Sequence, residues 1–172
     1  MSTRSRIGII LKKEDLNKTF NCPDTPEGKE YAVKTYGRLM SVYCHNDGYI
    51  DGVGLDLSEM FPEKDPGTYD KLLKYITKGD RTTSTVSYIE WRNEPWNYVQ
   101  PAVCKVTTDG TDATADQFSV DEITEACKNI ATSGIEYVYV YDAATMTWYV
   151  YDVYGNTFDL LRDKLAEINI RW

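Results

Sequence analysis

The stretch EYVYVYDAATMTWYVYDVY, residues 136–154, decides the fold of this chain. Tyrosine and valine alternate up to residue 141, and aromatic residues dominate again from residue 147. Alternation of this kind is typical of β-strands, because successive side chains point to opposite faces of a sheet. The five residues Asp142–Met146 between the two runs predict the turn of an antiparallel hairpin. Both faces of the hairpin would be apolar or aromatic, so we expect it at the centre of a sheet with other elements packed on each side.

The rest of the chain predicts an α+β fold with a mainly antiparallel sheet, in which the Tyr-rich C-terminal hairpin is central and three to four short helices pack around it. Ser119 and Glu122 form the capping-box pattern that starts a helix, which should end near Gly134. We expect one domain over residues 1–172, with 13–37 as a long loop or irregular insertion. The remaining expected strands are 6–12, 39–44, 82–91 and 102–107, and the remaining expected helices are 52–61, 67–78 and 158–168, the last capped by Thr157.

The composition is that of a globular protein, with 42% hydrophobic and 27% charged residues. Tyrosine is unusually frequent, with 14 Tyr against 4 Phe, and suits sheet faces that are half buried or contact a partner. The apolar stretch 7–11 is too short for a signal-peptide core or a membrane span. We therefore expect a cytoplasmic protein without membrane contact. The cysteines are scattered and predict free thiols: Cys22, Cys44, Cys104 and Cys127.

The net charge of −8 is unevenly distributed. Residues 1–38 hold eight Lys or Arg against five Asp or Glu, whereas residues 106–161 hold ten Asp or Glu and one base, Lys128. This distribution argues against bulk nucleic-acid binding, which requires phosphate neutralisation. The negative field would attract a partner protein with a basic surface, or would serve only to keep the chain in solution.

The acidic stretch 109–125 contains three candidate partner-binding residues, Asp112, Asp116 and Asp121. Carboxylates spaced in this way could imitate a phosphate backbone on the surface of another protein. The structural alternative is that they offset the dipole of the following helix and decorate a solvated loop.

A second candidate site combines the start of the chain with the turn after the strand at 39–44. Arg4 and Arg6, two apart on a strand, would point the same way and could grip a phosphate or carboxylate, or could pair with acidic residues of the chain itself. The turn contains the only histidine of the chain, close to two aspartates. The imidazole and the carboxylates could hold a divalent cation or act as acid and base, or the aspartates could serve only to form turns. The residues of the turn are Tyr43, His45, Asp47, Tyr49 and Asp51.

No motif for a phosphate-binding loop, a dinucleotide site or a nucleophile elbow occurs in the sequence. Cys44 neighbours His45, but adjacent strand residues point to opposite faces, which is poor geometry for a thiol and its base. We therefore expect no catalytic residue, no metal ligand and no cofactor.

Several segments together resemble a family of small proteins of unassigned function found in phages and prophages. The resemblance covers most of the chain in order and implies a phage context without a known activity. The residues that carry it are Ser2–Arg6 with Ile7, Tyr43–Tyr49, Gly79-Asp80, Thr85–Tyr88, Glu136–Tyr139 and Trp148-Tyr149.

This resemblance implies a phage accessory protein in the host cytosol that binds and inhibits or modulates a host component, which could belong to antiviral defence. The first alternative is a small-ligand protein, in which Arg4, Arg6, His45 and the turn tyrosines enclose a nucleotide or a nucleotide-derived signal. The second alternative is a small metal-assisted hydrolase that uses His45 with Asp47 and Asp51.

Overall fold

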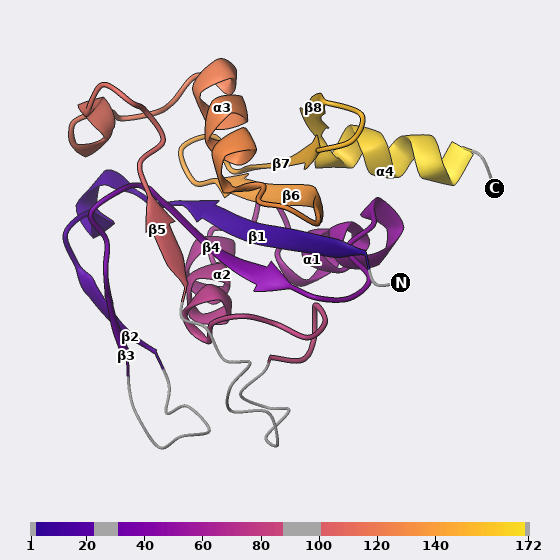
Figure 1. Cartoon of the computed structure of the whole chain (residues 1–172), viewed down its shortest axis with the longest axis horizontal. Coiled ribbons are helices and arrows are strands. Elements are labelled where there is room, and N and C mark those ends of the chain that lie inside the picture. The colour runs from indigo at the N-terminus through magenta and orange to yellow at the C-terminus, as the bar shows by residue number, and fades with distance from the viewer. Residues whose placement is uncertain (1–2, 23–30, 88–100, 171–172) are drawn as a thin grey trace.

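The computed structural model describes residues 3–22, 31–87 and 101–170 (Figure 1). Its centre is a six-stranded sheet with the strand order β5-β4-β1-β6-β7-β8. Neighbouring strands are antiparallel, except that β1 and β6 are parallel. The mainly antiparallel α+β fold expected from the sequence is thereby confirmed. The strands are β1 (Arg4–Ile10), β4 (Leu39–Cys44), β5 (Ala102–Cys104), β6 (Ile135–Asp142), β7 (Thr147–Asp152) and β8 (Thr157–Leu160).

Helices cover both faces of this sheet, with α3 on one side and α1 and α2 on the other (Figure 1). A single π-helical turn at Ile50–Gly54 leads into α1, and short 3-10 turns lie at Lys13–Asp15 and Thr111–Ala113. None of the helices in the described part of the chain has the length and hydrophobicity needed to span a bilayer. The α-helices are α1 (Leu55–Met60), α2 (Thr68–Thr77), α3 (Val120–Ile130) and α4 (Leu161–Ile170).

The hairpin of β6 and β7 separates two hydrophobic cores. Tyr139 and Trp148 pack with the apolar residues of α1 and α2, whereas Val138 and Val140 pack with those of α3. All four side chains are completely buried. The alternation seen in the sequence therefore divides its residues between two buried faces, which confirms the expected central position of the hairpin.

One expected helix is wrong in its first third. Residues 157–160 form strand β8, and α4 begins only at Leu161. Asn156 adopts a left-handed φ of 51° in the preceding turn, which lets the chain reverse beside β7. The Phe158 ring then stacks on Tyr149, with centroids 5.0 Å apart. Pairing with a long neighbouring strand outweighs the local helix signal at Thr157.

The strand expected at 82–91 is also wrong where it is described; residues 88–91 lie outside the described part. Residues 82–87 form a tight loop closed by an isolated bridge between Arg81 and Ser87. The Thr83 hydroxyl accepts the Val86 amide hydrogen at 3.1 Å, so a side chain provides a bond that a strand partner would otherwise make. The strand expected at 102–107 is shortened to β5.

Residues 13–37, expected as a long loop or irregular insertion, contain a short antiparallel hairpin. Strands β2 (Thr19–Cys22) and β3 (Tyr31–Lys34) pair with each other in a separate two-stranded sheet. At its base, the buried Thr35 hydroxyl donates to the Asp15 carbonyl at 2.7 Å.

The capping box at the start of α3 is present as expected. The Ser119 hydroxyl accepts from the Glu122 amide at 3.1 Å, and the Glu122 carboxylate accepts from the Ser119 amide at 2.9 Å. We expect Ser119→Ala to lower the free energy of unfolding by about 1 kcal/mol, because the first turn loses its acceptor. Urea denaturation measures this change. Ser133→Ala, at an exposed position outside the helix, is the control, and equal midpoints for the two variants would contradict the prediction.

Candidate functional site

The turn after β4 is held rigidly against the centre of the sheet. Asp47 has a left-handed φ of 60°, and the Gly48 amide donates to the Thr3 carbonyl at 2.9 Å. A Cβ atom on Gly48 would lie 2.8 Å from that carbonyl oxygen, so only glycine fits here. The buried Tyr139 hydroxyl donates to the Gly48 carbonyl at 2.6 Å. The turn is therefore fixed to both β1 and β6.

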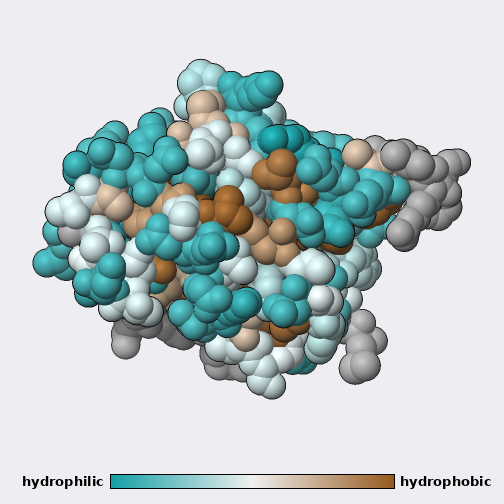
Figure 2. All heavy atoms as spheres, turned by 90° about the horizontal axis from the view of Figure 1, so that it is seen from above, coloured by the Kyte–Doolittle hydropathy of each residue, from teal (hydrophilic) through white to brown (hydrophobic). Residues whose placement is uncertain are grey.

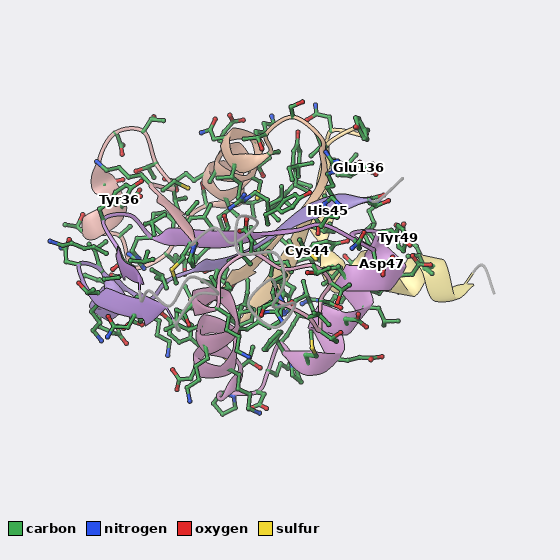
Figure 3. All side chains as sticks on the ribbon, turned by 60° about the horizontal axis from the view of Figure 1, so that its bottom comes forward. Tyr36, Cys44, His45, Asp47, Tyr49 and Glu136 are labelled. Carbon is green, nitrogen blue, oxygen red and sulfur yellow. The ribbon has the colours of Figure 1, made fainter. Side chains whose placement is uncertain are left out.

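Within this turn, His45 and Asp47 have different partners. The Tyr43 hydroxyl lies 2.7 Å from Nδ1 of His45, whereas the Asp47 carboxylate accepts from the Tyr49 hydroxyl at 2.9 Å. Figure 3 shows His45, Asp47 and Tyr49 gathered at one end of the molecule, with Tyr36 at the other. Among the described residues, no group of three His, Cys, Asp or Glu side chains could hold a metal ion. The acid–base cluster considered for His45, Asp47 and Asp51 gains no support from this geometry.

The two-arginine clamp is not assembled either. Nε of Arg6 donates to the Ser41 hydroxyl at 3.1 Å, and Nη2 donates to the Ser41 carbonyl at 3.2 Å. The guanidinium group of Arg6 is therefore bound within the sheet. Burial lowers the pKa of Arg6, while the charge of Asp80 acts in the opposite direction. Arg4 is exposed at the start of β1. Of the expected ligand residues, Arg6 is therefore an internal structural group.

Asp80 is a buried carboxyl group beside this region, named above only as part of the family resemblance and not as a candidate site residue. It is 7% exposed and accepts the Tyr43 amide hydrogen at 3.1 Å. Burial raises its pKa to about 6, although the Tyr43 amide and the Arg6 charge act in the opposite direction. No sequence pattern predicts its burial, because its environment is created by the distant strands β1 and β4.

The three cysteines whose side chains are described are free thiols, as expected: Cys44, Cys104 and Cys127. Burial raises the pKa of Cys44 to about 12 and that of Cys104 to about 11. Thiols of this kind stay protonated and are poor nucleophiles.

A half-open hollow lies on the other side of the turn, where Tyr49 and Tyr137 face α4. Its volume is about 470 Å³. Tyr49 is 43% exposed, and Lys164 lies 3.6 Å from Asp159 and 3.5 Å from Glu167. We call it the tyrosine hollow; it is lined by Tyr49, Ile50, Asp51, Tyr137, Lys164, Glu167 and Ile168.

The structure places the three acidic candidates in three different environments. Asp112 is only 2% exposed, and its carboxylate accepts the amides of Val106 and Thr107 at 2.6 and 2.7 Å. It holds the loop in shape and is not available to a partner, which corrects the expectation for this residue. Asp116 is exposed and pairs with Lys13 at 3.3 Å, while Asp121 is exposed in the first turn of α3.

Asp121 belongs to a second half-open hollow, of about 490 Å³, between the 106–109 segment and α3. Among the described residues that line it, four carry carboxylates and none is a lysine or arginine. Lys128 is not one of the lining residues but pairs with one of them, Glu125, at 3.2 Å. We call it the acidic hollow; it is lined by Val106, Thr107, Thr108, Asp109, Asp121, Glu122, Glu125 and Asn129.

The chain matches no family model, no curated protein sequence and no solved structure. The resemblance to phage proteins therefore stays a prediction.

The raised pKa of Asp80 predicts a pH dependence of stability. The folded state binds this proton more tightly than the unfolded state, so the stabilisation is complete below the unfolded pKa of 3.8 and is lost as the pH rises through about 6. Asp80→Asn keeps an acceptor for the Tyr43 amide and removes this titration. From about pH 4 to pH 7, the variant should gain stability relative to the wild type by up to about 3 kcal/mol. Urea denaturation across this range measures the difference, and parallel curves would contradict the prediction.

Proposed function

We propose that this chain is a non-catalytic interaction protein that binds a basic surface of another protein through the acidic hollow. In line with the phage family that the sequence resembles, the partner would be a host component. The observation that carries this proposal is a hollow whose described lining holds four carboxylate residues and no lysine or arginine. A lysine or arginine side chain of a partner would supply the missing positive charge.

The walls of the acidic hollow are held in place before any partner arrives. The capping box fixes the start of α3, and α3 packs on the sheet through Ile123 and Cys127. The opposite wall is fixed by Asp112, whose carboxylate binds two successive amides of the loop. A preformed site loses little conformational entropy on binding, which favours affinity.

The surface around the hollow suits recognition by charge. Figure 2 shows the side of the molecule that carries α3: it is mainly hydrophilic, with small, separate hydrophobic patches. The chain holds 27 acidic against 19 basic residues. A field of this sign accelerates the approach of a basic partner and weakens as salt is added.

The proposal is tested by neutralising two carboxylates of the hollow. We expect Asp121→Asn with Glu125→Gln to weaken binding of the partner by about tenfold, since exposed ion pairs contribute modestly one by one. The partner is first identified by affinity purification with the tagged chain from host cells. Its dissociation constant is then measured with purified proteins at low and at high salt.

A matched control removes the same two charges elsewhere. Glu59→Gln with Asp70→Asn changes exposed residues of α1 and α2, on the opposite face of the sheet. This variant should bind like the wild type. Equal losses in both variants, or an affinity that does not depend on salt, would contradict the acidic hollow as the binding site.

The tyrosine hollow favours a second candidate function, the binding of a small nucleotide. Tyr49 and Tyr137 line it and could stack on a planar base, and Lys164 is the one cationic residue among its described lining residues. A nucleotide that binds the folded state should raise the melting temperature, and Tyr49→Ala should abolish this rise. If no member of a nucleotide panel stabilises the chain, this candidate is wrong.

A further inference from the structure

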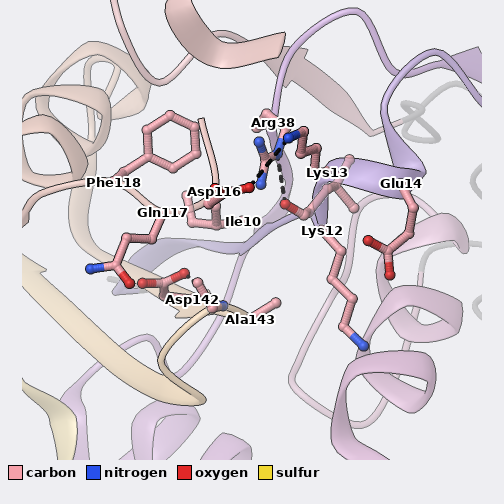
Figure 4. Close-up of a pocket in the computed structure, with 12 residues that line it drawn as sticks. Ile10, Lys12, Lys13, Glu14, Arg38, Asp116, Gln117, Phe118, Asp142 and Ala143 are labelled. Carbon is pink, nitrogen blue, oxygen red and sulfur yellow. Dashed lines mark hydrogen bonds and ion pairs between the residues drawn. The ribbon is translucent and has the colours of Figure 1, made fainter. Parts of the chain in front are cut away.

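A third cavity, of about 310 Å³, lies where the end of β1 meets the turn between β6 and β7 (Figure 4). The segment before α3 closes its remaining side. We call it the Arg38 cavity; it is lined by Ile10, Leu11, Lys12, Lys13, Glu14, Arg38, Asp116, Gln117, Phe118, Asp142, Ala143 and Ala144.

Arg38 is the unusual residue of this cavity. It is only 2% exposed, yet one nitrogen of its guanidinium group makes no hydrogen bond within the described part of the chain. Nε donates to the Leu11 carbonyl at 2.8 Å, and Nη1 donates to the carbonyls of Asp112 and Ala115 at 3.0 and 2.6 Å. Within the described part of the chain, Nη2 donates to no acceptor and is not fully buried. Two N–H donors of a fixed charge are therefore available.

The guanidinium group cannot turn away from the cavity. Its three hydrogen bonds tie it to β1 and to the loop before α3, and the Phe118 ring lies 5.1 Å from its central carbon. A donor held in this way binds an acceptor without first losing rotational freedom.

The charges of the cavity limit the ligand to a single negative group. Lys12, Lys13 and Arg38 line the cavity together with Glu14, Asp116 and Asp142. The Lys12 ammonium group lies over the Tyr69 ring, 4.6 Å from its centroid. Lys13 and Asp116 pair with each other at 3.3 Å. A polyphosphate would bring several negative charges close to these carboxylates, whereas a single carboxylate group on Nη2 brings one, which the guanidinium charge offsets.

Other walls of the cavity are apolar. Ile10 and Phe118 belong to the core on the α3 side of the sheet, and Ala143 lies across the cavity from Phe118 (Figure 4). Such walls suit a short aliphatic group attached to the carboxylate. The volume of about 310 Å³ excludes ligands much larger than a small metabolite.

We propose that the Arg38 cavity binds a small monocarboxylate, whose carboxylate accepts hydrogen bonds from Nη2 of Arg38 and whose aliphatic part contacts Phe118 and Ala143. The ligand is either a plain carboxylate or a zwitterionic amino acid. This site is separate from the acidic hollow and does not depend on the proposed interaction function.

The test uses four probes with the intact chain: sodium propionate, L-alanine, propylammonium chloride and inorganic phosphate. Propionate, L-alanine or both should raise the melting temperature at roughly 50 mM and matched ionic strength, because they bind only the folded state. In amide NMR spectra, the shifts should be confined to residues near 116–118 and 142–144. A response to propionate identifies a plain carboxylate site, and a response to L-alanine alone identifies a zwitterion site.

Two variants locate the site. Ala144→Leu adds bulk at the exposed rim of the cavity and should weaken the binding probe by about tenfold. Ala166→Leu, at an exposed position of α4, is its control and should leave the affinity unchanged. Arg38→Lys removes Nη2 and should abolish binding if this variant folds. If it does not fold, the comparison of Ala144→Leu with Ala166→Leu and the NMR shifts still test whether the ligand binds in this cavity.

Three results would overturn the proposal. The first is that neither carboxylate probe binds, and the second is that propylammonium or phosphate binds as well as the best carboxylate. The third is that Ala144→Leu binds like the wild type and the amide shifts lie elsewhere.

Discussion

The parallel pairing of β1 with β6 is the constraint on which the rest of the structure depends. It joins residues 4–10 to residues 135–142 in the middle of the sheet, and each strand has a second, antiparallel neighbour on its other side. Both strands are buried on both faces, as strands of this kind must be when helices lie above and below. Burial of Ile7, Ile9 and Tyr139 contributes about 1.5–3 kcal/mol for each side chain. The turn at Gly48 and the loop at Arg38 take their positions from this central pair.

The sequence predicted those parts of the fold that are encoded locally. The alternation in β6 and β7, the capping box of α3 and the bounds of β4 are all visible within a dozen residues. The parallel partner of β6 was not predictable, because it lies more than 120 residues away and leaves no local pattern. The strand β8 was mistaken for a helix for the same reason: its pairing with β7 is a tertiary contact that overrides a local signal.

The candidate sites show the same division between local and distant information. Residue type alone suggested a functional role for Asp112. In the structure its carboxylate accepts two amide hydrogens of the neighbouring loop and so has a structural role. Arg6 is occupied by Ser41 of the adjacent strand, which no spacing rule reveals. Conversely, Arg38 belongs to no motif, and only its burial beside an open cavity distinguishes it from other arginines. Asp121, by contrast, is exposed in the first turn of α3.

The lengths of the outer strands have a consequence for how the chain behaves at high concentration. The described sheet ends in β5 and β8, which have three and four residues, whereas β6 in the middle has eight. Short edge strands offer a second molecule few unpaired backbone groups with which to extend the sheet. Repulsion between the negatively charged molecules further disfavours such pairing. The longest, most aromatic strands, which would be the most prone to fibril formation, are kept in the interior, so resistance to self-assembly follows from the strand order itself.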